Sequence, residues 1–400
     1  MDWFFLPHWP LPPSALAWVA LLLLSAVLAG EAVRRWLHLP RLLGYVLAGI
    51  VLGPEVSALL DARIALDLRI FLDVALGLLL FEVGQRIDLG WLRRNPWLFG
   101  TSVLESALSF AGALAVLLYC GLKPIAATLA ALLAMSTSPA VIMTVVKDLR
   151  AQGQLTERLL LLTALNTVYA VLAVTMILAW LSLEYRGDLV LMIAHPLYLG
   201  LGSLLLSAVA SALTLGLLRW FGRRPNVQFT LVVGAVLGAV ALSNSLRLSV
   251  PLTMLAYGVF TRVFDYDRRF VSFRLGEGAM LFVVMLFALS ALSLDFSGGS
   301  SVFGNALALA SARFAGKAAA VTLLARPSGL GWRKAVLLAA GLTPLSALGL
   351  ILFLDVVALY PQITGELGPT LHVAIAMLAV VGPVATQFAI RRAGEAAEHA

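Results

Sequence analysis

The chain has 400 residues, of which 61% are hydrophobic and only 12% are charged. Soluble globular proteins average roughly 45–50% apolar and about 25% charged residues, so the composition excludes a soluble fold and indicates an integral membrane protein. The net charge of +7 does not indicate nucleic-acid binding, because no long basic cluster occurs and Lys and Arg commonly set topology in membrane proteins. We therefore expect a lipid bilayer, and no nucleic acid, as the partner of this chain.

Apolar segments follow one another along the chain, separated by charges, proline and glycine. Most approach the ~20 residues that a helix needs to cross the hydrocarbon core. They cover residues 12–30, 41–57, 68–85, 97–119, 123–146, 158–183, 189–218, 228–245, 250–264, 275–294, 302–325, 333–357 and 368–390. The pattern predicts an all-α membrane protein with about thirteen transmembrane helices. Cys120 is the single cysteine, which excludes an internal disulfide and a cluster of Cys metal ligands.

The basic residues predict the orientation of these helices. Most of the 28 Lys and Arg residues lie in the loops that follow odd-numbered segments or in the tail. By the positive-inside rule these loops are cytoplasmic. We therefore expect the N-terminus outside, the C-terminus inside and a short cytoplasmic tail at 392–400. The aromatic, proline-rich start, "MDWFFLPHWPLPPS", predicts an interfacial segment and not a cleaved signal.

Three stretches of the first half recur, in order, in the second half. "LLGYVLAGIVLGP" resembles "PLTMLAYGVFTR", "FEVGQRIDL" resembles "FALSALSLDF", and "AMSTSPAVI" resembles "GLTPLSALG". The matched residues are Gly49 with Gly258, Asp88 with Asp295, and Pro139 with Pro344. The partners lie seven segments apart, so the two copies cross the membrane in opposite senses. Inverted repeats are typical of secondary transporters. Helices 2–6 and 9–13 would form them, in a single membrane domain.

The predicted organisation of that domain is an N-terminal helix (1–40), a first repeat (41–185), two linking helices (186–246) and an inverted second repeat (247–391). Helices 5 and 12 contain "STSP" and "LTPLS" near their centres. Proline removes a backbone hydrogen bond, and the freed groups need protein or water around them. Two breaks at one depth predict a shared polar site. Its oxygen ligands would come from Thr137, Ser138, Thr343 and Ser346, next to Pro139 and Pro344.

Two further helices carry polar residues inside apolar segments. Helix 11 has Arg313 and Lys317 on one face. A cation within the membrane usually marks a pathway or a buried pair. Helix 6 has Asn166 and Thr167, which can ligate a cation or join helices but cannot carry a proton. We expect Lys317 in the site and Arg313 in a supporting, mainly structural role.

With these residues in place, the chain resembles the monovalent cation:proton antiporters of Kef type and their bacterial Na+/H+ relatives. The resemblance rests on "LPRLLGYVLAGIVLGPE" (39–55), "STSPAVI", "RFAGK" and "GLTPLSALGL". It implies a homodimer in the bacterial inner membrane, with a dimerisation domain, a mobile core, and unwound helices 5 and 12 that cross. It also implies elevator-type exchange of H+ for Na+ or K+. Lys317 matches the family's basic residue that pairs with the ion-binding carboxylate.

The chain departs from this family at helix 6. The family usually presents an acidic pair, or Asn or Gln followed by Asp, where this chain has Asn166 and Thr167. Exchange needs a group for which H+ and the cation compete, which is typically a buried carboxylate. Glu82, one turn before Arg86, is our first candidate, together with Asn166, Thr167 and Lys317. Glu105 is the second candidate, with a supporting role. The alternative interpretation of Glu82 is an i,i+4 ion pair with Arg86 at the membrane surface.

The leading functional hypothesis is therefore a cation:proton antiporter that needs no cofactor and no metal beyond its transported ion. Two alternatives remain open. One is a transporter of another class on this fold, either a proton-independent ion path or a carrier of an anion or solute. The other is a membrane subunit that does not transport and acts with an accessory partner. No nucleophile–base set or metal cluster indicates an enzyme.

Overall fold

The computed structural model describes residues 15–54, 56–57, 69–87, 89–186, 189–221, 225–265, 277–292, 294, 299–345, 348–350, 352–353, 356 and 361–397. Ser346, Asp88 and Asp295, which the sequence analysis singled out, lie outside these residues. The described part is built from helices: α1 (Ala15–Ala32), the π-helical turn η1 (Val33–Leu37), α2 (Arg41–Leu52), α4 (Arg69–Arg86), α5 (Leu89–Arg94), α6 (Pro96–Tyr119), α7 (Pro124–Met135), α8 (Pro139–Asp148), α9 (Gln154–Arg186), α10 (Leu189–Phe221), α11 (Pro225–Ser245), α12 (Val250–Phe264), α13 (Glu277–Leu292), α14 (Gly299–Leu323), α15 (Trp332–Gly341) and α17 (Pro361–Arg392).

The all-α membrane fold is confirmed, since every predicted apolar segment overlaps one of these helices. Within the described residues, seven helices are long and apolar enough to cross a membrane, and four shorter apolar helices accompany them. The number of thirteen spans stays a prediction.

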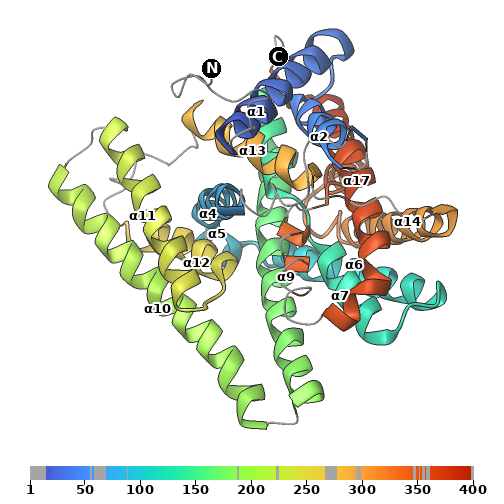
Figure 1. Ribbon diagram of the computed structural model, residues 1–400. Coiled ribbons are helices and arrows are strands. Elements are labelled where there is room, and N and C mark those ends of the chain that lie inside the picture. The colour runs from blue at the N-terminus through green and yellow to red at the C-terminus, as the bar shows by residue number, and fades with distance from the viewer. Residues whose placement is uncertain are drawn as a thin grey trace, which may run out of the picture.

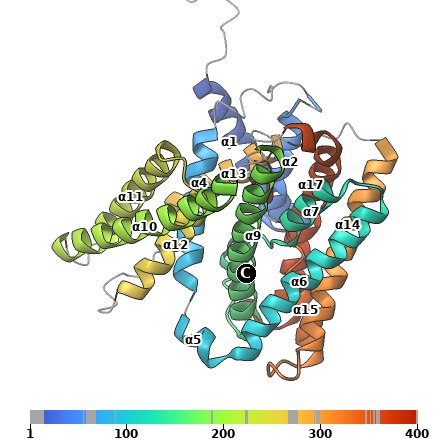
Figure 2. The ribbon, with the colours of Figure 1, turned by 90° about the horizontal axis from the view of Figure 1, so that it is seen from below.

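The helices form two bundles with α9 between them (Figures 1 and 2). In the first bundle, α4 packs against α11, α12 and α13, α2 packs against α1 and α13, and α10 packs against α11 and α12. In the second bundle, α14 packs against α6, α15 and α17, while α7 and α8 pack against α17. Helix α9 touches members of both bundles. Figure 2 shows α10–α12 on one side and α6, α14 and α15 on the other.

Glycine contacts reflect the internal repeat. A Cβ on Gly49 of α2 would lie 2.2 Å from the Ala288 carbonyl oxygen of α13. A Cβ on Gly258 of α12 would lie 2.1 Å from the Phe81 carbonyl oxygen of α4. The two glycines are equivalent in the repeat, and Phe81 and Ala288 are equivalent as well. The same close helix approach thus occurs twice. In one case the glycine comes from the first copy and the carbonyl from the second, and in the other case the roles are exchanged, as an inverted repeat requires.

The two predicted helix breaks are present and meet. Helix α7 ends at Met135, and α8 begins at Pro139 with Ser138 as its N-cap, the Ser138 hydroxyl accepting from the Val141 N–H at 3.4 Å. Proline is well tolerated at this first helical position because its missing N–H has no partner there anyway. Thr137 forms an isolated antiparallel bridge with Leu345, and the Ser138 N–H donates to the Pro344 carbonyl at 3.1 Å. The extended residues of the two breaks therefore cross side by side.

Candidate functional site

Arg313 joins the two breaks from α14. Its guanidinium is fully buried and donates to five backbone carbonyls. These are Ala134 at 2.5 Å in the last turn of α7, Ser136 at 2.9 Å in the first break, and Leu342 at 3.3 Å, Thr343 at 2.6 Å and Pro344 at 3.0 Å in the second break. The last carbonyls of a helix have no partner within it and carry partial negative charge. One guanidinium thus neutralises the C-terminal ends of both α7 and α15.

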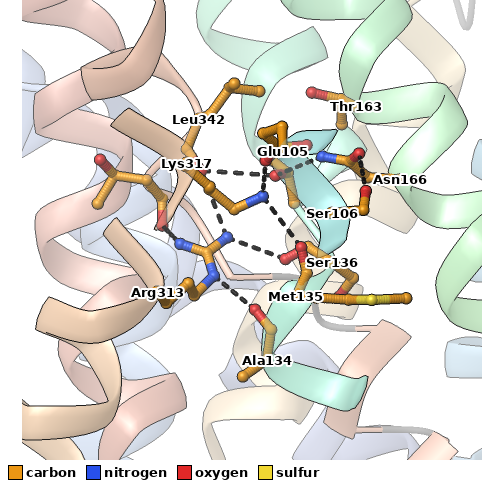
Figure 3. Close-up of polar contacts among 12 residues, drawn as sticks. Glu105, Ser106, Ala134, Met135, Ser136, Thr163, Asn166, Arg313, Lys317 and Leu342 are labelled. Atoms are coloured by element: carbon orange, nitrogen blue, oxygen red, sulfur yellow. Dashed lines mark hydrogen bonds and ion pairs between the residues drawn. The ribbon is translucent and has the colours of Figure 1, made fainter. Parts of the chain in front are cut away.

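Lys317, one turn further along α14, forms an ion pair with Glu105 of α6 (Figure 3). Both side chains are 0% exposed. The Lys317 ammonium also donates to the Met135 carbonyl at 3.0 Å, at the end of α7. The helices approach closely at this point, since a Cβ on Gly316 would lie 2.5 Å from the Leu108 carbonyl oxygen. A buried charge needs a partner, and here Lys317 and Glu105 are each other's counter-ion.

The Glu105 carboxylate is not saturated. Lys317 binds its Oε1 atom, whereas Oε2 is buried without a hydrogen-bond partner among the described residues. The same is true of the Ser109 hydroxyl, one helical turn along α6. An ionised carboxylate can accept several hydrogen bonds or ligate a cation. Two oxygen atoms next to the ion pair, Glu105 Oε2 and the Ser109 hydroxyl, can therefore still accept a hydrogen bond or ligate a cation.

Asn166 connects α9 to this cluster. Its Oδ1 atom accepts from the Ser106 hydroxyl at 2.8 Å, and its Nδ2 atom donates to the Thr137 hydroxyl at 3.3 Å. The Thr137 hydroxyl in turn donates to the Leu342 carbonyl at 3.4 Å. All of these side chains are buried. Helices α6 and α9 and both breaks are thus joined by one continuous polar network, part of which is visible in Figure 3.

Not every predicted site residue faces this network. Thr137, Asn166, Arg313 and Lys317 meet in it. Thr167 is buried, but its hydroxyl donates to the Thr163 carbonyl of its own helix at 2.9 Å. The hydroxyls of Ser138 and Thr343 also act locally: Ser138 caps α8, and Thr343 donates to the Ala340 carbonyl at 2.7 Å. Pro139 and Pro344 shape the breaks.

The structure reverses the order of the two candidate carboxylates. The functional hypothesis grouped Glu82 with Lys317, and the alternative paired it with Arg86. The Glu82 carboxylate contacts Arg86 at 3.1 Å, as the alternative expects, and also Lys147 at 3.4 Å. These partners lie in the last turns of α4 and α8. The place beside Lys317 belongs to Glu105, which the sequence analysis ranked second. The reason is the packing of α6 on α14, which turns Glu105 towards Lys317.

Sequence reasoning missed the serines of α6. Ser102, Ser106 and Ser109 recur with Glu105 at intervals of three and four residues in "SVLESALS", which places them on one face of a helix. Ser102 donates to the Tyr169 hydroxyl at 3.2 Å, and Ser106 binds Asn166. Four polar residues on one face of an apolar segment were a signal available in the sequence. In the part of the chain that is described, no group of three or more His, Cys, Asp and Glu residues is arranged to hold a metal.

Comparisons with known proteins agree with this architecture. The family model described as sodium/hydrogen exchanger, transmembrane, matches residues 20–392. A structure of the sodium proton antiporter MjNhaP1 from Methanocaldococcus jannaschii at pH 8 superposes with a TM-score of 0.70 and 15% identity, over 94% of this chain and 95% of that one. An electron-microscopy structure of the same antiporter gives a TM-score of 0.70 and 16% identity, over 95% and 96% of the two chains. No curated protein matches this chain by sequence.

Proposed function

This chain belongs to the sodium/hydrogen exchanger family, and on that premise we propose that it exchanges Na+ or K+ for protons at the Glu105–Lys317 pair. Family and fold support cation/proton antiport by a multi-pass membrane protein. The single observation that carries the assignment of the site is the fully buried ion pair beside the crossing of the two broken helices. Antiport needs cation binding and proton binding to exclude each other, and the Glu105 carboxylate can pair either with a transported cation or with the protonated Lys317.

The charges of the pair allow a balanced exchange. A monovalent cation that binds the Glu105 carboxylate takes the place of the Lys317 ammonium. Lys317 then lies in an apolar interior without its counter-ion, where a charged form is strongly disfavoured, and it gives up one proton to water. Cation release and reprotonation of Lys317 restore the ion pair. One cation is exchanged for one proton at this pair, and the charge of the cluster stays constant.

The surroundings of Glu105 provide the oxygen ligands that hard cations prefer. Its Oε2 atom and the Ser109 hydroxyl have no hydrogen-bond partner among the described residues. The Asn166 amide lies beside this face of α6, because its Oδ1 atom accepts a hydrogen bond from Ser106. Thr167 stands where the resemblance implies an acid, so in this proposal the cation-binding carboxylate lies on α6 instead of α9, and Lys317 on α14 carries the proton.

An anion carrier is less well supported by the geometry. That alternative assumed that Lys317 lacks a partner, but Glu105 neutralises it. The charge of Arg313 is opposed by the carbonyls at the ends of α7 and α15. The alternative of a subunit that does not transport is separated from antiport by a flux assay.

The transport cycle that we propose is elevator-type alternating access. The second bundle and α9 carry the whole polar network, so they would form the moving core, while the first bundle would provide the dimer contact of a homodimer. We place the protein in the bacterial inner membrane. The positive-inside rule puts its N-terminus outside and the basic ends of α4 and α8, with Arg86 and Lys147, at the cytoplasm.

The test is proton movement in proteoliposomes loaded with a pH-sensitive dye. We expect Na+ or K+ gradients to drive proton flux through the wild-type protein and not through Glu105→Gln, while Glu82→Gln still exchanges protons. If Glu105→Gln exchanges protons at the wild-type rate, the assigned site is wrong. If no cation drives proton flux in the wild type, the antiport assignment fails.

A further inference from the structure

A cluster of charges lies where the end of α4 meets the end of α8. Glu82 is 2% exposed, although it sits in the last turns of α4. Arg86 approaches its Oε1 atom to 3.1 Å, and Lys147 approaches the same atom to 3.4 Å. Arg86 and Lys147 are 32% and 39% exposed. Two partly exposed cations therefore hold one buried carboxylate.

The two ion pairs differ in what they connect. Glu82 and Arg86 lie four residues apart on α4, so this pair persists however the bundles move. Lys147 is in the last turn of α8, which packs against α9 and α17 of the second bundle. Of these two ion pairs, the Glu82–Lys147 pair is the one that joins the two bundles. The next residue, Asp148, lies within electrostatic reach of Arg34 and Arg41 from the first bundle, so the end of α8 faces that bundle at two successive positions.

Helix α8 connects this contact directly to the crossing. It has 10 residues and so spans about 15 Å, with Ser138 at the crossing and Lys147 at the far end. A short helix transmits a displacement at one end to the other. Motion of the crossing relative to the first bundle therefore changes the distance between Glu82 and Lys147.

We propose that the Glu82–Lys147 ion pair is a latch between the two bundles, which holds the cytoplasmic side closed and parts when the moving bundle opens to the cytoplasm. The latch rests on the alternating access put forward under the proposed function. It makes Glu82 a positioning residue of the transport cycle and not an ion-carrying one. Its buried carboxylate, held on α4 by Arg86, gives Lys147 a fixed docking point.

The chain supplies a matched pair of variants. Lys147→Gln and Arg86→Gln each remove one cation from Glu82, and in each case the other cation remains. Neither leaves a buried charge alone, so both are expected to fold. Only Lys147→Gln removes a contact between the bundles, and Arg86→Gln is the control.

Hydrogen–deuterium exchange tests the latch without any transport. For each variant, amide exchange is measured in the bundle that does not contain the substitution. We expect Lys147→Gln to speed amide exchange at the end of α4 by about threefold or more, because the closed state loses part of its population. Arg86→Gln should leave the exchange rates of the last turn of α8 unchanged. Unchanged α4 exchange in Lys147→Gln, or faster α8 exchange in Arg86→Gln, would overturn the latch.

Transport kinetics supply the functional measurement. Opening the cytoplasmic side raises the fraction of protein competent to bind there, so the KM for the cation on that side should fall by about threefold in Lys147→Gln. The KM of Arg86→Gln should equal that of the wild type. Equal KM changes in the two variants, or none in Lys147→Gln, contradict the proposal. If the wild type itself transports no ions, the proposed function fails. The hydrogen–deuterium exchange experiment still decides whether the latch exists.

Discussion

Lys317 on α14 and Glu105 on α6 form a fully buried ion pair, and Lys317 also donates to the last carbonyl of α7 at Met135. Lys317 thus connects the interior of α6 to the end of α7, where the first helix break begins. Removing one partner leaves a charge in the membrane interior without a counter-ion, whereas replacing both removes the desolvation cost as well.

This relationship predicts a strongly non-additive effect on stability. Glu105→Gln and Lys317→Gln should each lower the free energy of unfolding by about 3–5 kcal/mol, because each leaves one buried charge unpaired. The double variant should be more stable than either single variant. Unfolding in detergent, followed by intrinsic fluorescence against denaturant, measures all three. Additive losses in the double variant would show that the two groups do not interact.

Arg313 predicts a different outcome, since its role depends on geometry as well as charge. Its guanidinium donates to five carbonyls of two breaks, a fork that the three donors of a lysine ammonium cannot reproduce. We expect Arg313→Gln and Arg313→Lys both to lower the unfolding midpoint, with lysine restoring less than half of the loss. Full recovery in Arg313→Lys would mean that charge alone stabilises the crossing.

The contact between Ser106 and Asn166 can be measured in the same way. Ser106→Ala and Asn166→Ala should show a coupling free energy of about 0.5–1.5 kcal/mol in a double-mutant cycle. Thr163→Ala serves as the control, because the Thr163 hydroxyl donates to the Leu159 carbonyl within α9. Coupling of Ser106→Ala with Thr163→Ala as large as that with Asn166→Ala would contradict the assigned hydrogen bond.

The elements of the fold were predictable because they depend on local chemistry. Pro139 and Pro344 lie in apolar segments too long to be interrupted without consequence, and both breaks occur where they were expected. The equivalence of Gly49 and Gly258 was also predictable from the sequence, because a repeated motif keeps its small residues where helices touch.

The partner of Lys317 was not predictable from one sequence. Glu105 lies 212 residues away in the chain, and only the packing of α6 on α14 brings the two together. Glu82 attracted attention because it is a carboxylate inside an apolar segment. Its actual partners, Arg86 and Lys147, depend on how α4 meets α8. Local sequence shows which charges are in the membrane and not which of them pair.

The C-terminal tail gives a prediction for the pH dependence of stability. Glu395 accepts hydrogen bonds at the start of α9 from the Leu155 and Thr156 N–H groups, at 2.9 and 2.8 Å, and pairs with Lys334 at 3.1 Å. Burial alone would raise the pKa of Glu395, but these hydrogen bonds outweigh it and lower the pKa below its ordinary value of 4.5. The folded state therefore favours the ionised carboxylate.

A lowered pKa means that this stabilisation is fully present above about pH 4.5 and is lost as the pH falls through the folded-state value. Glu395→Gln should be less stable than the wild type by about 2 kcal/mol at pH 7, and the difference should shrink below pH 4.5. Unfolding midpoints of both proteins between pH 7 and pH 3.5 measure it. A difference that stays constant over this range would rule out an ionised Glu395 as its source.

Proton release on cation binding tests the central claim most directly. Purified protein in weakly buffered detergent is mixed with NaCl or KCl, with choline chloride as the ionic-strength control, and a pH indicator counts the protons. We predict about one proton released per protomer in the wild type, because the bound cation replaces the charge of Lys317 at Glu105, and none in Glu105→Gln. Equal release from the two proteins, or none from the wild type with either cation, would contradict exchange at this ion pair.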